Sequence, residues 1–289
     1  MTAQLSPPDA PRRVPLRPAR RWVLAVGVVL SLAAIAWGVL LMINLLGRTT
    51  ETTSSTLRPD LPVLMVSAAG GGIRVTGGDV SDVRITTRLT YGWGKPRIIQ
   101  ESGPDGIRLD ISCPWWTLVC GASYDVVVPR AFDVRADSSG GSVTVRDLSG
   151  RLEATSSGGS ITASNVTGPV RADSSGGGIT LDGADGPLDL NSSGGRISAT
   201  GIHGAEVSAG SSGGGIRLEF ATPPDLVTAD SSGGGVELLL PPVTGGYDVE
   251  ASSSGGSRTV DVPADPASAR KVTARSSGGS VKVLPADDG

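Results

Sequence analysis

The sequence predicts an all-β protein, a single-stranded parallel β-solenoid preceded by one transmembrane α-helix. Three observations support this prediction. The tetrapeptide Ser-Ser-Gly-Gly occurs eight times, and successive copies begin 18, 18, 18, 19, 20, 22 and 23 residues apart. Apolar and polar residues alternate on both sides of each copy, and an uncharged apolar stretch lies near the amino terminus. A repeat interval of this size is typical of solenoids, in which each coil is one repeat.

The amino-terminal segment predicts a membrane-spanning helix. Residues 1–21 contain five arginines, five prolines and one acid, which is typical of a disordered basic tail. Residues 22–47 carry no charge, and a helix of this length reaches about 39 Å, enough to cross about 30 Å of hydrocarbon. The preceding arginines favour a cytoplasmic amino end and an extracytoplasmic carboxyl domain. A signal peptide cleaved after Ala34-Ile35-Ala36 is the alternative, but the apolar stretch continues well past that point.

The next segment, residues 48–61, is rich in Ser and Thr and predicts a polar stalk. Residues 62–130 repeat less regularly and are expected to form an amino-terminal cap of the solenoid. The only cysteines of the chain, Cys113 and Cys120, lie in this region. We expect them to form a disulfide, because the domain is expected outside the cytoplasm. A metal-binding pair is the alternative, although two thiols without nearby ligands make a poor site.

Residues 131–285 are expected to form the regular coils, and residues 286–289 a short tail. Each copy of the tetrapeptide is preceded by two inward residues in strict alternation, such as Val170 and Ala172, and followed by a second pair, such as Ile179 and Leu181. Period-two alternation predicts strands with one buried face. Stacked coils would pair in parallel and bury a narrow continuous core.

Serine and glycine have separate expected roles in each coil. The alternation places the first serine of each copy inside, where we expect a stacked ladder of hydroxyls that bond to one another. These serines are Ser138, Ser156, Ser174, Ser192, Ser211, Ser231, Ser253 and Ser276. Glycines are expected at the second corner because they accept positive φ. They are Gly150, Gly168, Gly186 and Gly204.

Two features depart from the regular pattern. Arg258 occupies an inward position that is valine or isoleucine in the other copies, so the seventh coil is expected to be distorted or shifted in register. The longer intervals near the carboxyl end come from insertions at 221–225, 241–246 and 261–270. These insertions are expected to project from one side of the last coils, as a contact site or as tolerated surface variation.

Several chemistries find no support in the sequence. The chain has one histidine, His203, and a net charge of −3, which disfavours a histidine metal site and nucleic-acid binding. No phosphate-binding Gly-Lys-Ser/Thr motif or nucleophile elbow occurs, and the acids are misplaced for a calcium-binding β-roll. We therefore expect no catalytic, cofactor or metal site.

The region that contains "GPDGIRLD", the cysteine pair, "YDVVVP" and the glycine-cornered coils resembles the bacterial family of putative adhesins with β-strand repeats. The resemblance covers about residues 62–285. It implies a single-stranded β-helix displayed at the cell envelope, with no catalytic residues.

Three functions are therefore compared. A membrane-anchored adhesin or envelope scaffold, bound to cell-wall polymer or another envelope protein, is favoured. The alternative is a sensory ectodomain of an envelope-stress system, for which Trp93, Trp115 and Trp116 are the candidate contact patch, although these tryptophans also suit a cap over the open end. A polysaccharide-cleaving β-helix enzyme is least favoured, because the outward carboxylates are discontinuous and aromatic platforms are few.

Overall fold

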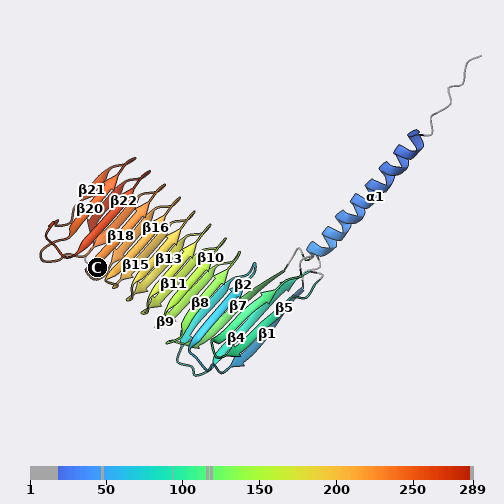
Figure 1. Ribbon diagram of the computed structural model, residues 1–289, viewed down its shortest axis with the longest axis horizontal. Helices are drawn as coiled ribbons and strands as arrows, with labels where there is room; N and C mark the ends of the chain where they lie inside the picture. The colour runs from blue at the N-terminus through green and yellow to red at the C-terminus, as the bar shows by residue number, and fades with distance from the viewer. Residues whose placement is uncertain (1–18, 47–48, 93, 115–116, 118–119, 287–289) are drawn as a thin grey trace, which may run out of the picture. The chain divides into compact units, whose positions relative to one another are not determined.

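The computed structural model describes residues 19–46, 49–92, 94–114, 117 and 120–286 (Figure 1). The chain divides into two compact units, Met1–Gly47 and Arg48–Gly289, which are described separately below. Residues 1–18 of the expected basic tail, Trp93, Trp115, Trp116 and most of the expected carboxyl-terminal tail lie outside the described residues.

The described part of the first unit is one helix, α1 (Ala19–Leu46). Its segment Trp22–Met42 has a mean hydropathy of 2.5, and none of its central window is buried by protein. The segment is therefore long and apolar enough to cross a bilayer, as the sequence predicts.

The second unit consists of two long sheets, and from β6 onward successive strands of the chain alternate between them. The strands are β1 (Thr49–Leu57), β2 (Val63–Ala68), β3 (Ile73–Gly78), β4 (Val83–Tyr91), β5 (Arg97–Gly103), β6 (Gly106–Ser112), β7 (Cys120–Pro129), β8 (Asp133–Ser138), β9 (Val143–Leu148), β10 (Leu152–Ser156), β11 (Ile161–Val166), β12 (Val170–Ser174), β13 (Ile179–Ala184), β14 (Leu188–Ser192), β15 (Ile197–Ile202), β16 (Glu206–Ser211), β17 (Ile216–Phe220), β18 (Leu226–Ser231), β19 (Val236–Leu240), β20 (Asp248–Ser253), β21 (Arg258–Val260), β22 (Lys271–Ser276) and β23 (Val281–Pro285). Sheet A has the order β1-β4-β7-β3-β9-β11-β13-β15-β17-β19-β23-β21. Sheet B has the order β20-β22-β18-β16-β14-β12-β10-β8-β2-β6-β5.

Each regular coil contributes one strand to each sheet, and equivalent residues pair in parallel with the next coil. Val170 pairs with Leu152 on one side and Leu188 on the other, and Ile179 likewise lies between Ile161 and Ile197. The inward residues of both sheets form one continuous apolar core. The β-solenoid expected from the alternation is therefore confirmed. It forms because no coil can bury its own apolar face without a neighbour.

The order of coils in space departs from the chain order at the carboxyl end. The last coil, β22 and β23, lies between β18/β19 and β20/β21, so the seventh coil occupies the end of the stack. The connection 261–270 spans this return. Arg258 therefore lies on the terminal coil, where its side chain is exposed. The expected shift in register does not occur, because Arg258 pairs in line with Val281.

The amino end contains a similar reordering. Strands β2 and β3 pair in parallel with β8 and β9 on one side and with β6 and β7 on the other. Most of the expected irregular cap thus continues the coil. Antiparallel pairing among the described strands is confined to β1 with β4, β4 with β7 and β5 with β6.

The prediction of a polar stalk at residues 48–61 is wrong for most of this range. Strand β1 covers Thr49–Leu57 and pairs along its whole length with β4. Nζ of Lys95 lies 2.7 Å from a carboxylate oxygen of Glu51 on this strand. Its Thr-rich sequence suits an edge strand, because β-branched residues favour strands and a polar face can remain in water.

Candidate functional site

The first serines of the repeats bond to the backbone. Seven of the eight are buried, and Ser253 on the terminal coil is half-buried. Ser174 is representative: its Oγ donates to the carbonyl oxygen of Gly159 on the preceding coil at 3.2 Å and accepts from the N–H of Gly177 at 3.1 Å. The expected hydroxyl-to-hydroxyl ladder is therefore incorrect, because backbone groups at the corner are closer and need partners of their own.

The corner glycines are required by contact between coils. A Cβ at Gly168 would lie 2.1 Å from the carbonyl oxygen of Gly150, and one at Gly150 would lie 2.1 Å from that of Phe132. A Cβ at Gly186 would lie 2.4 Å from the carbonyl oxygen of Gly168, and one at Gly204 would lie 2.3 Å from that of Gly186. None of these four glycines has positive φ, so the expected conformational reason is wrong and the steric reason replaces it.

Positive φ values near this corner occur instead at one equivalent position of four successive coils, which the sequence interpretation did not identify. Asp147, Asn165, Gly183 and Gly201 have φ values of 56°, 53°, 74° and 61°. Nδ2 of Asn165 donates to Oδ1 of Asp147 at 3.0 Å. The signal was available, since Asp, Asn and Gly tolerate this conformation and recur every 18 residues here.

The cysteine pair forms the expected disulfide. Cys113 and Cys120 are bonded to each other, with 6.1 Å between their Cα atoms. The bond joins the end of β6 to the start of β7, and both cysteines pack against the core. The metal-pair alternative is therefore excluded for this form of the protein.

One buried hydroxyl in this region stands out. The side chain of Tyr124 on β7 is 2% exposed, and its Oη has no hydrogen-bond partner among the described residues. Burial, with a smaller contribution from the Asp110 carboxylate, raises the pKa of Tyr124 to about 12.

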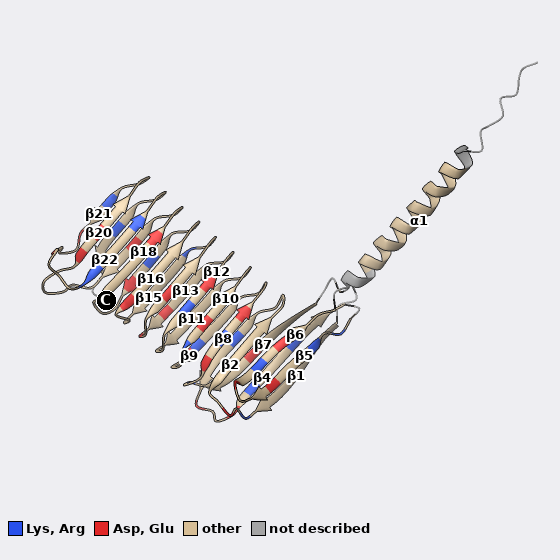
Figure 2. Cartoon of the chain, in the orientation of Figure 1, with Lys and Arg blue, Asp and Glu red and all other residues tan. Residues whose placement is uncertain are grey.

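Ion pairs connect neighbouring coils on the outer face of sheet B. Arg135 contacts Glu153 on the next coil at 3.4 Å, and Arg171 contacts Asp189 at 2.6 Å. Figure 2 shows basic and acidic residues on neighbouring strands of the solenoid. These pairs place an arginine beside the carboxylates of Glu153 and Asp189.

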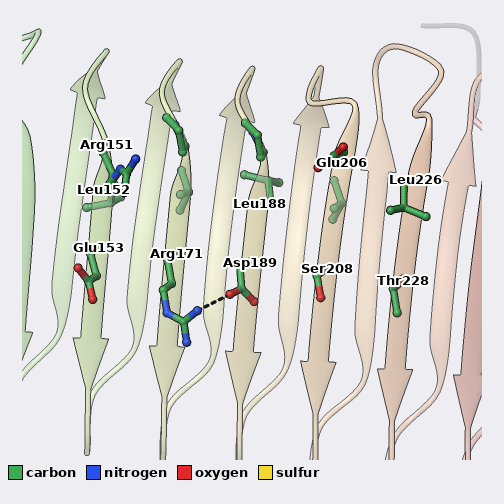
Figure 3. Close-up of a pocket in the computed structure, with 14 residues that line it drawn as sticks. Arg151, Leu152, Glu153, Arg171, Leu188, Asp189, Glu206, Ser208, Leu226 and Thr228 are labelled. Carbon is green, nitrogen blue, oxygen red and sulfur yellow. Dashed lines mark hydrogen bonds and ion pairs between the residues drawn. The ribbon is translucent and has the colours of Figure 1, made fainter.

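A groove of about 640 Å³ runs across the same face, over β10, β12, β14, β16 and β18 (Figure 3). Pro169, Pro187 and Leu226 give it apolar surface, and the Leu226 side chain is 44% exposed. Arg151 and Glu206 line the groove beside these residues. Within the described part of the chain, neither charged side chain makes an ion pair. The groove thus combines an apolar floor with two available charges of opposite sign.

The groove was not predicted, although part of its signal is visible in the sequence. Pro169 and Pro187 lie 18 residues apart and directly precede the inward residues Val170 and Leu188. The outward residues of the groove differ in type from coil to coil, from Glu153 and Arg171 to Thr228, so only the stacking of five strands brings them together.

The third carboxyl-proximal insertion, 261–270, contacts the other two. Nη1 of Arg270 donates to the carbonyl oxygens of Pro223 and Pro224 at 3.2 Å and contacts the Asp225 carboxylate. Oγ of Ser268 donates to the carbonyl oxygen of Gly246 at 2.9 Å. The insertions at 221–225 and 241–246 therefore hold the return connection, residues 261–270, in place.

Comparison with known proteins assigns the repeat region to a protein family. The family model described as Toastrack DUF4097 matches residues 125–284, more than half of the chain. A "putative adhesin" from Bacteroides fragilis is 15% identical, with a TM-score of 0.47, and the match covers 81% of this chain and 97% of that one. A "putative cell adhesion protein" from Clostridium sporogenes is 10% identical, with a TM-score of 0.32, and the match covers 82% and 100% of the two chains. No curated relative shows significant sequence similarity.

Proposed function

Because the chain belongs to the Toastrack DUF4097 family, we propose that it is a membrane-anchored, non-catalytic binding module of the cell envelope. In this proposal α1 holds the chain in the membrane and the β-solenoid lies on the extracytoplasmic side. The groove over β10 to β18 binds an extended polymer of the cell wall.

The membrane placement is supported by α1 and its flanking charges. The helix is a candidate single span, and five arginines precede its apolar segment. An excess of arginine marks the cytoplasmic side of a span. The disulfide between Cys113 and Cys120 agrees with an oxidising compartment for the solenoid.

The groove is the observation that carries the binding function. Its volume of about 640 Å³ falls within the range of about 300–1,000 Å³ usual for ligand sites. It crosses five parallel strands, which lie about 4.8 Å apart, so it suits a ligand extended along the solenoid. Pro169, Pro187 and Leu226 offer apolar contact, while Arg151 and Glu206 offer groups for orientation.

The non-catalytic part of the proposal is supported by two of the three carboxylates that line the groove. Glu153 and Asp189 are each paired with an arginine. A polysaccharide-cleaving pair needs one carboxylic acid whose pKa is raised and which is free to protonate the leaving group. Glu153 and Asp189 are instead held by their arginine partners, so neither carboxylate is free for that role.

The experiment measures binding of the detergent-solubilised full-length chain to purified, insoluble cell-wall sacculi. The variant Pro187→Ser with Leu226→Ser removes apolar contact from the groove and leaves the inward residues intact. The matched control, Thr144→Ala with Thr180→Ala, changes the outer face of sheet A. We expect the groove variant to bind at least about tenfold more weakly, roughly 1.4 kcal/mol, and the control to bind like wild type. Equal binding by both variants, or absence of wild-type binding, would contradict the proposal.

A further inference from the structure

The coil that ends the solenoid carries the one charged residue in an otherwise apolar inward column. Parallel pairing aligns Arg258 with Val281, which lies inside the core. The members of the column in the other regular coils are also buried and apolar: Val143, Ile161, Ile179, Ile197, Ile216 and Val236. Arg258 is exposed because no further coil covers β21.

This end of the solenoid has the features of a surface that another coil could cover. Strands β20 and β21 are the outermost strands of their sheets, so one edge of each is free of a strand partner among the described residues. Val249, Ala251 and Val260 are only half-buried here, although the equivalent residues of the preceding coil are fully buried. Free strand edges beside apolar surface are templates for pairing with another chain.

An arginine in the inward column opposes such pairing. A coil stacked on β20 and β21 would enclose the guanidinium in the narrow core, where an unpaired charge is costly. Inward-pointing charges are one of the ways in which sheet proteins block edge-to-edge association. The return of the chain, which inserts β22 and β23 beneath β20 and β21, places the arginine-bearing coil at the end.

We propose that the β20/β21 end is a self-association surface for a second copy of this chain, and that Arg258 keeps it closed. The second copy would pair through the same end, because an isologous contact closes as a dimer and sets strands of equal length against each other. This inference is independent of the ligand of the groove.

The test is sedimentation velocity of the full-length chain in detergent, over a wide range of protein concentration. We expect Arg258→Val to dimerise at concentrations at least about tenfold lower than wild type. Arg258→Lys retains the charge and should behave like wild type. Arg146→Val, which replaces an exposed arginine on β9, is the matched control and should not change the assembly state.

A second substitution distinguishes the proposed surface from any other contact. Adding Ala251→Lys to Arg258→Val restores an inward charge on β20 and should abolish the new dimer. Circular dichroism and urea unfolding establish that each variant is folded, and Arg258→Thr replaces Arg258→Val if the valine variant does not fold. A folded Arg258 variant without charge that remains as monomeric as wild type would overturn the proposal. Dimerisation that persists in the lysine double variant would also overturn it.

Discussion

At the scale of single residues, the two serines of each tetrapeptide differ in burial and in hydrogen bonding. The first serine, such as Ser174, is buried and satisfies two backbone groups at the corner. The second, such as Ser175, is exposed, and only its backbone N–H bonds to the preceding coil, at Ser156. Identical neighbours in the sequence therefore differ in burial and in hydrogen bonding, and we expect them to differ in their contribution to stability.

Replacing Ser174 by alanine should lower the free energy of unfolding by about 1–3 kcal/mol, because it leaves two partly buried backbone groups without this partner. Urea unfolding monitored by circular dichroism measures this change. Ser175→Ala is the control and should change it by less than about 0.5 kcal/mol. Equal effects of the two substitutions would show that the two hydrogen bonds of Ser174 contribute little.

The raised pKa of Tyr124 leads to a prediction of how the free energy of unfolding changes in alkaline solution. Burial raises its pKa in the folded chain to about 12 from a normal value of 10.0. The unfolded chain therefore loses this proton first, and the free energy of unfolding falls as the pH rises from about 10 to about 12, by roughly 2–3 kcal/mol. Below pH 10 the group is protonated in both states and contributes no pH dependence.

Tyr124→Phe should reduce this alkaline loss and should leave stability near pH 7 unchanged or slightly higher, since the removed hydroxyl has no partner among the described residues. Urea unfolding at a series of pH values provides the measurement. Tyr91→Phe is the comparison for removal of a tyrosine hydroxyl that does have a hydrogen-bond partner, because the Tyr91 hydroxyl donates to a carboxylate oxygen of Glu51 at 3.2 Å. An unchanged alkaline loss in Tyr124→Phe would assign the effect to other groups.

At the scale of elements, the disulfide joins consecutive strands that belong to different sheets. Strand β6 lies in sheet B and β7 in sheet A, and Cys113 and Cys120 close the short connection between them. The crosslink acts mainly by restricting the unfolded chain. Its effect should therefore concentrate on the amino-terminal coils.

Replacing Cys113 and Cys120 by serine should lower the free energy of unfolding of this region by about 2.5 kcal/mol. Hydrogen exchange of the amides in β6 and β7 measures the local effect, and amides in β13 and β14 serve as the internal reference. Coils of a solenoid contact only their neighbours, so the reference amides should change far less. Equal loss of protection in both regions would indicate that the solenoid opens as one cooperative unit.

At the scale of the whole molecule, the proposed orientation predicts which residues are reached from outside the cell. Protease added to intact cells should degrade the solenoid or release it from the membrane. An epitope inserted before Trp22 should remain protected until the membrane is permeabilised. Cleavage of that epitope in intact cells, together with a protected solenoid, would contradict the orientation.

Local patterns were sufficient for the repeating part of the molecule. Period-two alternation beside Ser138 to Ser276 determined the strands, their inward faces and the parallel stacking, because each coil repeats the same contacts with its neighbours. The cysteine pairing and the candidate membrane helix also followed from short segments. The strand formed by Thr49–Leu57 was missed, because a Ser/Thr-rich segment is equally suited to a polar linker and to a solvated edge strand.

By itself, the sequence thus determined the solenoid, its core and the anchor-like helix, which depend on periodicity and on length. Only the tertiary structure decided the order of the coils at both ends, the groove over β10 to β18 and the exposed position of Arg258. The physical reason is that all coils offer nearly identical edges to one another. Chain order therefore does not fix which coil lies beside which, and only the summed packing of the complete stack selects one arrangement.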